Sequence, residues 1–234
     1  MKIRLDKFIS NQLNIPRSMA RTQIKRGKVT VAGEVIRDFA FSFDPELSKI
    51  CYKNETVFYK EHLYLYINKP KGVISATEDK QKKTVIDLLP ENLRRQGMAP
   101  VGRLDRDTTG LLLITDDGDF AHNVISPKKQ IVKTYIAELD GDITDQIIES
   151  FKEGITLADG KKCLPAILSR ICENTAEIKI YEGKYHQVKR MFGVVGLGVN
   201  ELKRVSIGSF SLPEDINPGE CRELTEENIA LIFK

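Results

Sequence analysis

A short polar stretch, Gly102-Arg103-Leu104-Asp105-Arg106-Asp107-Thr108-Thr109-Gly110, is the clearest candidate for chemistry in this chain. Four apolar residues, 111–114, follow it at once and predict a buried strand. Acidic side chains beside such a strand add little to a core, but a rigid strand can hold a carboxylate in a fixed place. We therefore predict that Asp105 is a reactive carboxylate.

Two other interpretations of Asp105 compete with this one. The order Asp-x-Asp-x-Thr over residues 105–108 also occurs in dehalogenase-type phosphatases, which use magnesium. In those enzymes the motif follows a buried parallel strand, whereas here the apolar run comes after the motif. Asp105 could instead cap a helix or hold a turn, as is expected of the stretch 116–119. For an isolated aspartate the structural interpretation would be preferred, so the rest of the chain decides.

The elements around the motif predict an α+β fold rather than a regular β-α-β repeat. Further strands are expected over 63–67, 133–139, 166–170, 176–181 and 205–210. Helices are expected over 143–152 and 186–195, with a short one over 84–89. These elements indicate a mainly antiparallel sheet.

The front of the chain has a different pattern. Apolar spacing predicts helices over 5–13 and 19–26, the second capped by Ser18 and ended by Gly27. A hairpin with a turn at Ala32-Gly33 should follow. Arg17, Arg21 and Lys25 are four residues apart, so they share one helix face.

Charge separates the front from the rest. Residues 1–59 hold 11 Lys and Arg against 6 Asp and Glu, a net charge of +5, whereas residues 60–234 have a net charge of −2. We predict one domain over 1–59 and a second over 60–234. A basic module of this kind favours a polyanionic partner.

Composition excludes several classes of protein. No apolar run is long enough to span a membrane, and the charged N-terminus is unlike a secretory signal. The four cysteines lack Cys-x-x-Cys spacing, so we expect neither zinc nor disulfides and predict a reducing cytoplasm. The chain also lacks a phosphate-cradling glycine loop and metal-ligand clusters, and we expect no metal and no cofactor.

The front of the chain resembles the S4 RNA-binding domain, with its α-L arrangement. The resemblance is carried by Arg4-Leu5-Asp6-Lys7-Phe8, by residues 18–21 and by residues 27–33. It implies that a basic face grips RNA phosphates, which makes binding dependent on salt. The residues expected on this face are Arg4, Lys7, Arg17, Arg21, Lys25 and Lys28.

The remainder resembles the RsuA/RluB group of ribosomal RNA pseudouridine synthases. The resemblance rests on the Gly-Arg-Leu-Asp-x-Asp-Thr-x-Gly-Leu-Leu stretch over 102–112 and on Lys133-Thr134-Tyr135. It also rests on the stretches 182–192, 68–72 and 202–208. It implies a catalytic domain with a mainly antiparallel central sheet flanked by helices and a central cleft. It also implies cleavage of the bond between uracil N1 and ribose C1′ and reattachment through C5, with no cofactor.

The resemblance also implies roles for five side chains. Asp105 would act at the sugar, either as a nucleophile on C1′ or by removing a ribose proton to give a glycal. Lys189 would pair with Asp105 and keep it charged. Tyr135 would stack on the uracil, and Leu202 would pack on its other side. Arg103 would hold the phosphate or fill the space that the flipped base leaves.

The presence of the N-terminal module and the end of the chain at Lys234 favour members of the group that act on 16S rRNA. The expected partner is 16S rRNA or a partly assembled small-subunit particle, bound by a monomer, with no membrane involved. Two alternatives are a synthase for 23S rRNA and a non-enzymatic ribosome-assembly factor that has kept the fold.

Overall fold

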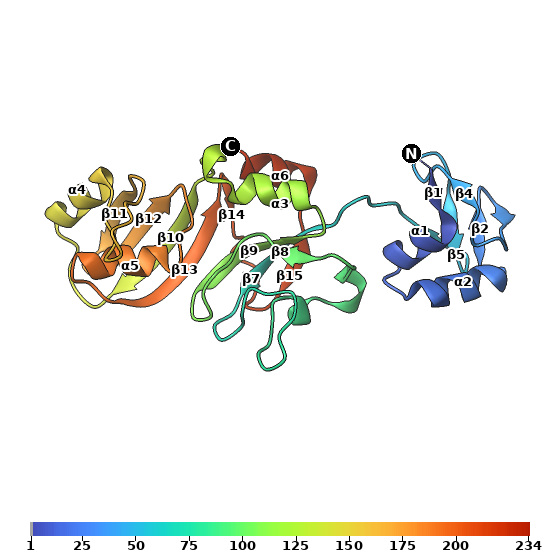
Figure 1. The fold of residues 1–234 in the computed structure, drawn as a ribbon, viewed down its shortest axis with the longest axis horizontal. Coiled ribbons are helices and arrows are strands. Elements are labelled where there is room, and N and C mark those ends of the chain that lie inside the picture. The colour runs from blue at the N-terminus through green and yellow to red at the C-terminus, as the bar shows by residue number, and fades with distance from the viewer. Residues whose placement is uncertain (1) are drawn as a thin grey trace. The chain divides into compact units, whose positions relative to one another are not determined.

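The computed structural model describes residues 2–234, which form two compact units. The N-terminal unit comprises the residues up to Leu63 together with Pro90–Met98, and the C-terminal unit comprises Tyr64–Leu89 and Ala99–Lys234. Both units combine helices with mainly antiparallel strands (Figure 1), so the predicted α+β class is confirmed. The predicted domain boundary between residues 59 and 60 stays a prediction.

The N-terminal unit packs two helices on a small sheet. The helices are α1 (Leu5–Gln12) and α2 (Arg17–Lys25). The strands are β1 (Ile3–Arg4), β2 (Val29–Val31), β3 (Glu34–Val35), β4 (Ser42–Phe43), β5 (Ile50–Tyr52) and β6 (Glu55–Val57). β1 pairs with β4, and the other four strands form a sheet in the order β3-β2-β5-β6. Leu5, Phe8 and Ile9 of α1 meet Ala20 and Ile24 of α2 in a closed core.

The predicted start of the second helix is wrong. We expected Ser18 to be the N-cap, but α2 begins at Arg17 and Pro16 is its N-cap. The Pro16 carbonyl already accepts a helical hydrogen bond from the Ala20 N–H at 3.0 Å. Proline suits the start of a helix because its fixed φ is compatible with that position and its missing N–H would have no partner there.

The C-terminal unit is built on one nine-stranded sheet. Seven strands follow one another across it in the order β11 (Ile167–Cys172), β12 (Thr175–Ile180), β10 (Lys133–Leu139), β13 (Val199–Ile207), β9 (Thr109–Thr115), β7 (Tyr64–Lys69) and β15 (Cys221–Glu223). The short strands β14 (Phe210–Ser211) and β8 (Ala99–Pro100) pair with β13 and β9. Within residues 2–234, the one parallel contact between named strands joins β9 to β13. This contact brings the strand after the Asp105 motif beside the strand that holds Leu202.

Helices cover both ends of this sheet (Figure 1). α3 (Gly118–Ile125) and α6 (Glu226–Ile232) contribute Phe120, Val124 and Ile232 to a core with Leu111 and Leu113 of β9. α4 (Asp145–Glu153) and α5 (Gln187–Val194) lie toward the β11 end. Within residues 2–234 there are also three single turns of 3-10 helix. Ile86–Leu88 and Pro127–Lys129 belong to this unit, and Glu91–Leu93 belongs to the N-terminal unit.

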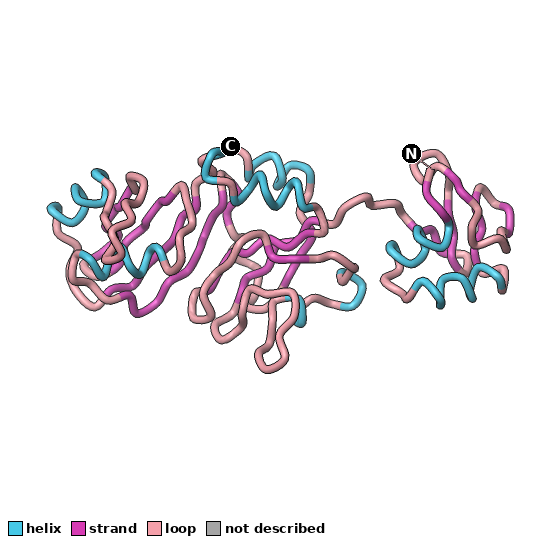
Figure 2. The backbone as a smooth tube through the Cα atoms, viewed as in Figure 1, coloured by secondary structure: helices cyan, strands magenta, loops and turns pink. Residues whose placement is uncertain are grey.

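The sequence analysis missed both α3 and α6. Asp117, expected in a turn, is the N-cap of α3, and its carboxylate accepts hydrogen bonds from the N–H groups of Asp119 and Phe120. The expected short helix over 84–89 is only the 3-10 turn at Ile86–Leu88. Figure 2 shows that the chain from Pro70 to Met98 is mostly loop, and this long excursion immediately precedes the segment that carries Asp105.

Candidate active site

The backbone of the loop that carries Asp105 is fixed by hydrogen bonds to the segment after β7. Ser75 contacts Leu104 twice, because its hydroxyl donates to the Leu104 carbonyl at 2.9 Å and accepts from the Leu104 N–H at 3.0 Å. The Gly72 N–H donates to the Arg106 carbonyl at 2.8 Å. The Thr108 N–H closes a turn on the Asp105 carbonyl at 3.1 Å. The Asp105 backbone is therefore held on both sides.

Lys69 lies fully buried beneath this loop. Its ammonium donates to the carbonyls of Thr108 at 2.7 Å, Pro70 at 3.1 Å and Arg106 at 3.3 Å. Burial lowers the pKa of Lys69 to about 8, and the negative charges of Asp107 and Asp105 limit the fall. No role was predicted for Lys69 from the sequence, yet it is an internal cation that organises the loop.

Gly110 joins the loop to the sheet at a very close backbone contact. Its φ is +97°, a conformation that side chains rarely adopt. A Cβ atom at this position would lie 2.2 Å from the Arg204 carbonyl oxygen. Only glycine therefore allows β9 to pair with β13 at Gly110 and Arg204, and this pairing sets the distance between the Asp105 loop and β13.

The facing wall of the site is the turn that leads into α5. Buried Glu182 accepts hydrogen bonds from the Leu164 N–H and the Gln187 amide, both at 2.9 Å, and pairs with Lys184. His186 then adopts a left-handed conformation with φ of 48° as the N-cap of α5. Its ring stacks on Tyr185, and its Nε2 lies 3.3 Å from Asp105 Oδ1.

The predicted pairing of Lys189 with Asp105 is wrong in its partner. Lys189 Nζ lies 2.5 Å from Asp107 Oδ2, while the side chain in contact with the Asp105 carboxylate is His186. The turn at 105–108 points the more exposed Asp107 carboxylate toward the first turn of α5, where Lys189 lies. The hydrogen bond from Lys189 lowers the pKa of Asp107 below its usual value, against the opposing effect of burial.

The floor of the site comes from β10 and β13. The Arg204 Nε donates to the Leu111 carbonyl at 2.7 Å, and its Nη1 donates to the Tyr135 hydroxyl at 3.4 Å. Lys133 donates to the Val124 carbonyl at 3.2 Å. Burial, with a smaller contribution from the Arg204 charge, lowers the pKa of Lys133 to about 8. Arg204 thus connects the expected base-stacking residue to β9.

The structure brings together all five residues that the sequence analysis placed in the site. Asp105, Tyr135, Lys189, Arg103 and Leu202 line one pocket. Asp105, Arg103 and Tyr135 also line an adjoining cleft of about 570 Å³, a size that suits a small organic group. Lys69, Lys133 and Arg204 were not assigned roles, although each falls in a stretch that carried the resemblance.

The predicted RNA-binding residues lie on the N-terminal unit, where they divide into two sets. Arg4, Arg17 and Arg21 converge on the Asp6 carboxylate. The other three are Lys7, Lys25 and Lys28. Among these, the Lys25 ammonium lies 5.3 Å from the centre of the Phe39 ring. The sequence analysis did not foresee the role of Asp6.

Among residues 2–234, no group of three His, Cys, Asp or Glu side chains is arranged to hold a metal ion. No helix in this part of the chain combines the length and the apolar character needed to cross a bilayer.

A partly exposed carboxylate beside a cleft, a tyrosine on the floor of the site and a separate basic unit suit an enzyme that acts on nucleic acid. Comparison with known proteins specifies the class. Residues 63–193 match the RNA pseudouridylate synthase family, and residues 3–46 match the S4 domain. The chain therefore belongs to the RNA pseudouridylate synthase family and is an enzyme that isomerises uridine in RNA.

The chain is similar over nearly its whole length to curated bacterial proteins. It is 42% identical to "Uncharacterized RNA pseudouridine synthase YtzG" of Bacillus subtilis, with 98% of each chain covered. It is 41% identical to "Ribosomal small subunit pseudouridine synthase A" of Escherichia coli, covering 98% of this chain and 100% of the relative. A solved structure described as a pseudouridylate synthase matches with a TM-score of 0.68 and 33% identity, covering 98% and 99%.

Proposed function

We propose that this protein converts a uridine of 16S rRNA in the small ribosomal subunit to pseudouridine, with Asp105 as the catalytic carboxylate. The substrate is supported by the similarity to small-subunit synthases, which extends over both the S4 domain and the catalytic region. The catalytic assignment is supported by one observation, the shared pocket of Asp105, Tyr135, Lys189 and Leu202.

The chemistry begins with a uridine flipped out of its stack into the cleft, at a cost of a few kcal/mol. Asp105 either attacks C1′ directly or removes a ribose proton to form a glycal, and in both routes the N1–C1′ bond breaks with its electrons leaving on the uracil. The uracil then turns and C5 bonds to C1′. In the first route this displaces Asp105 from C1′, and in the second Asp105 returns the proton to the ribose. The C5 proton is then lost to solvent and N1 takes up a proton. Tyr135 and Leu202 hold the free base between them during the turn.

The surrounding cations favour this sequence of steps. Lys69 is fixed under the Asp105 loop and Lys189 is fixed on Asp107, so positive charge is present near the carboxylate before substrate arrives. Arg103 is exposed at the rim of the cleft and is suited to a phosphate of the target nucleotide. His186 contacts Asp105 directly and limits the rotation of its carboxylate.

We also propose that the N-terminal unit contacts RNA through Arg4, Lys7, Arg17, Arg21, Lys25 and Lys28. We further propose that the substrate is free 16S rRNA or a partly assembled small-subunit particle, and that the enzyme works as a monomer in the cytoplasm.

The proposal is tested with rRNA that carries tritium at uracil C5, since that hydrogen is lost when C5 bonds to the sugar. Wild-type protein should release tritium from 16S rRNA and not from 23S rRNA. Asp105→Asn should release none while still binding RNA. Asp119→Asn makes an equal change of charge at an exposed residue of α3 and should behave as wild type. Release from 23S rRNA alone would overturn the substrate assignment, and an active Asp105→Asn variant would overturn the catalytic one.

A further inference from the structure

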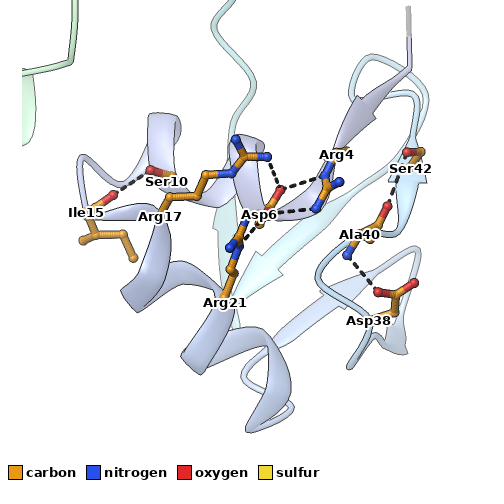
Figure 3. A network of polar contacts seen from close by, with 9 residues as sticks. All are labelled: Arg4, Asp6, Ser10, Ile15, Arg17, Arg21, Asp38, Ala40 and Ser42. Carbon is orange, nitrogen blue, oxygen red and sulfur yellow. Dashed lines mark hydrogen bonds and ion pairs between the residues drawn. The ribbon is translucent and has the colours of Figure 1, made fainter.

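A fully buried aspartate organises the basic face of the N-terminal unit (Figure 3). Asp6 lies in the first turn of α1 and accepts four hydrogen bonds from three arginines. Arg4 donates to both carboxylate oxygens at 3.2 Å, Arg17 donates to Oδ1 at 2.9 Å, and Arg21 donates to Oδ2 at 2.9 Å. Side chains from β1, α1 and α2 thus meet at one carboxylate.

The charges in this cluster do not cancel. Burial alone would raise the pKa of Asp6, but the hydrogen bonds from Arg17, Arg4 and Arg21 outweigh it and hold the pKa well below its usual range. The carboxylate is therefore charged at neutral pH, and one negative charge faces three positive ones. The cluster as a whole keeps a net charge of about +2.

The arginines are fixed by Asp6 and still accessible to a ligand. Their side chains are 43%, 47% and 44% exposed for Arg4, Arg17 and Arg21. Within residues 2–234, the hydrogen bonds that these guanidinium groups make all go to Asp6, which leaves other N–H groups of each unused. The Arg21 guanidinium also lies 5.1 Å from the centre of the Phe39 ring, which restricts it further.

We propose that Asp6 is a positioning residue that makes Arg4, Arg17 and Arg21 into one preformed site for a phosphodiester group of RNA. This inference rests on the proposed function and adds the residue that shapes the RNA contact. Planar guanidinium groups match phosphate oxygens in a two-point contact, which a lysine cannot reproduce. Holding the three groups in place before binding removes the entropy cost of ordering long side chains on the RNA.

The inference makes a prediction opposite to that of simple electrostatics. Asp6→Asn removes a negative charge beside three arginines, so a surface that binds RNA by charge alone should bind it more tightly. A site that depends on orientation should bind it more weakly, because a neutral amide cannot fix three guanidinium groups.

The test measures binding of the full chain to 16S rRNA over a series of salt concentrations. Asp6→Asn should weaken binding by about 3- to 10-fold, within the range expected for losing part of a charge-assisted phosphate contact. Glu55→Gln is the matched control, since it makes the same change of charge on an exposed residue of β6. This control should bind as tightly as wild type or slightly more tightly. Asp6→Asn binding at or above the wild-type affinity would overturn the inference.

A second pair of variants tests the same site without removing the buried carboxylate. Arg17→Lys keeps the charge and Asp6 but loses the planar fork, so its affinity should fall while its salt dependence stays the same. Arg26→Lys is the control, because Arg26 is exposed and follows α2. If hydrogen exchange shows that Asp6→Asn unfolds the N-terminal unit, the comparison of Arg17→Lys with Arg26→Lys tests the phosphate site instead. Equal affinity of the two lysine variants would overturn the inference.

The outcome is separable from that of the proposed function. Tritium release by the wild-type protein is measured on 16S and 23S rRNA in the same preparations. Weaker rRNA binding by Asp6→Asn combined with no release from 16S rRNA would support the phosphate site and reject the proposed substrate. Normal release from 16S rRNA combined with unchanged binding by Asp6→Asn would support the proposed substrate and reject the phosphate site.

Discussion

Two aspartates, one in each unit, show how the surroundings of a carboxylate decide its role. Asp6 has no exposed surface and receives four hydrogen bonds from three arginines. The Asp105 side chain is 26% exposed, lines a cleft, and has one oxygen 3.3 Å from His186 Nε2. Both aspartates occur in an Arg-Leu-Asp triplet, so the sequence near them looks alike.

The difference lies in where the fixed cations donate their hydrogen bonds. Around Asp6, the arginines donate to the carboxylate oxygens and leave neither oxygen free for another partner. Near Asp105 the buried cation Lys69 donates to backbone carbonyls of the loop, and Lys189 donates to Asp107. The loop is stabilised and the Asp105 oxygens remain available. A saturated carboxylate can shape its neighbours, whereas a carboxylate with free lone pairs can react.

The same substitution should therefore lower catalysis at Asp105 and RNA affinity at Asp6. The loss of catalysis is the largest effect we expect. Asp105→Asn should lower kcat for tritium release by about 10³-fold or more, as losses of essential groups do, with little change in RNA affinity. Asp6→Asn should change affinity and leave kcat on saturating RNA near the wild-type value. Single-turnover release and filter binding on the same preparations separate the two. Loss of kcat in both variants would show that the comparison is wrong.

Gly110→Ala should damage the catalytic site alone. The alanine Cβ would meet the Arg204 carbonyl, and the alanine backbone would have to adopt a positive φ. We therefore expect a loss of about 2–4 kcal/mol in the unfolding free energy of the C-terminal unit. Chemical denaturation followed by hydrogen exchange in each unit measures this. Gly33→Ala is the control, because a Cβ there meets nothing within 4 Å. Equal destabilisation by both variants would reject the close contact as the cause.

The contact between Lys189 and Asp107 should matter less than Asp105 itself. Lys189→Met should reduce kcat/KM by about 10- to 100-fold, since it removes a fixed positive charge beside the reacting loop. If the lysine acts through Asp107, Asp107→Asn should reduce kcat/KM less, and the double variant should be no worse than Lys189→Met. Multiplied effects in the double variant would show that Lys189 acts on Asp105 or the substrate directly.

The smallest effect we expect is an alkaline limb in the pH profile of activity. Lys69 has a pKa of about 8, so kcat/KM should fall above that pH by up to about tenfold per unit as the loop loses its cation. This fall is not unfolding. The folded pKa lies below the usual value of 10.5, so deprotonation of Lys69 favours the folded state between about pH 8 and 10.5.

Lys69→Met should remove this limb and lower the plateau. Lys133→Met is the matched control, because the pKa of Lys133 is also about 8 but its ammonium contacts the Val124 carbonyl instead of the loop. A limb that persists in Lys69→Met and disappears in Lys133→Met would transfer the assignment to the floor of the cleft.

Local patterns were enough to predict much of the fold. The strand over 133–139 was expected with the bounds that it has, and its Thr134, Tyr135 and Ile136 are of residue types that favour strands. α3 was missed because its first turn, Gly118-Asp119, follows two aspartates and reads as a turn. β13 begins at Val199, earlier than expected, because pairing with β10 extends a polar stretch that has no strand pattern of its own.

The site was predicted at the level of which residues gather, not of which atoms touch. The matched motifs were enough to bring Asp105, Tyr135 and Lys189 to one pocket. They could not show that Lys189 contacts Asp107, since that depends on the direction of a tight turn closed between Asp105 and Thr108. The convergence of three arginines on Asp6 was also hidden, because it depends on how α1 packs against α2 rather than on spacing within either helix.

The close contact between the backbones of Gly110 and Arg204 limits how this enzyme can be altered. The Asp105 loop and the strand bearing Leu202 touch with no room for a side chain, so neither can shift to suit a different nucleoside without the other. Efforts to retarget the enzyme should leave that contact intact and vary the arginine-bearing helix α2 and the hairpin after it. Variants that bind other RNA sites can then be selected without disturbing the reaction itself.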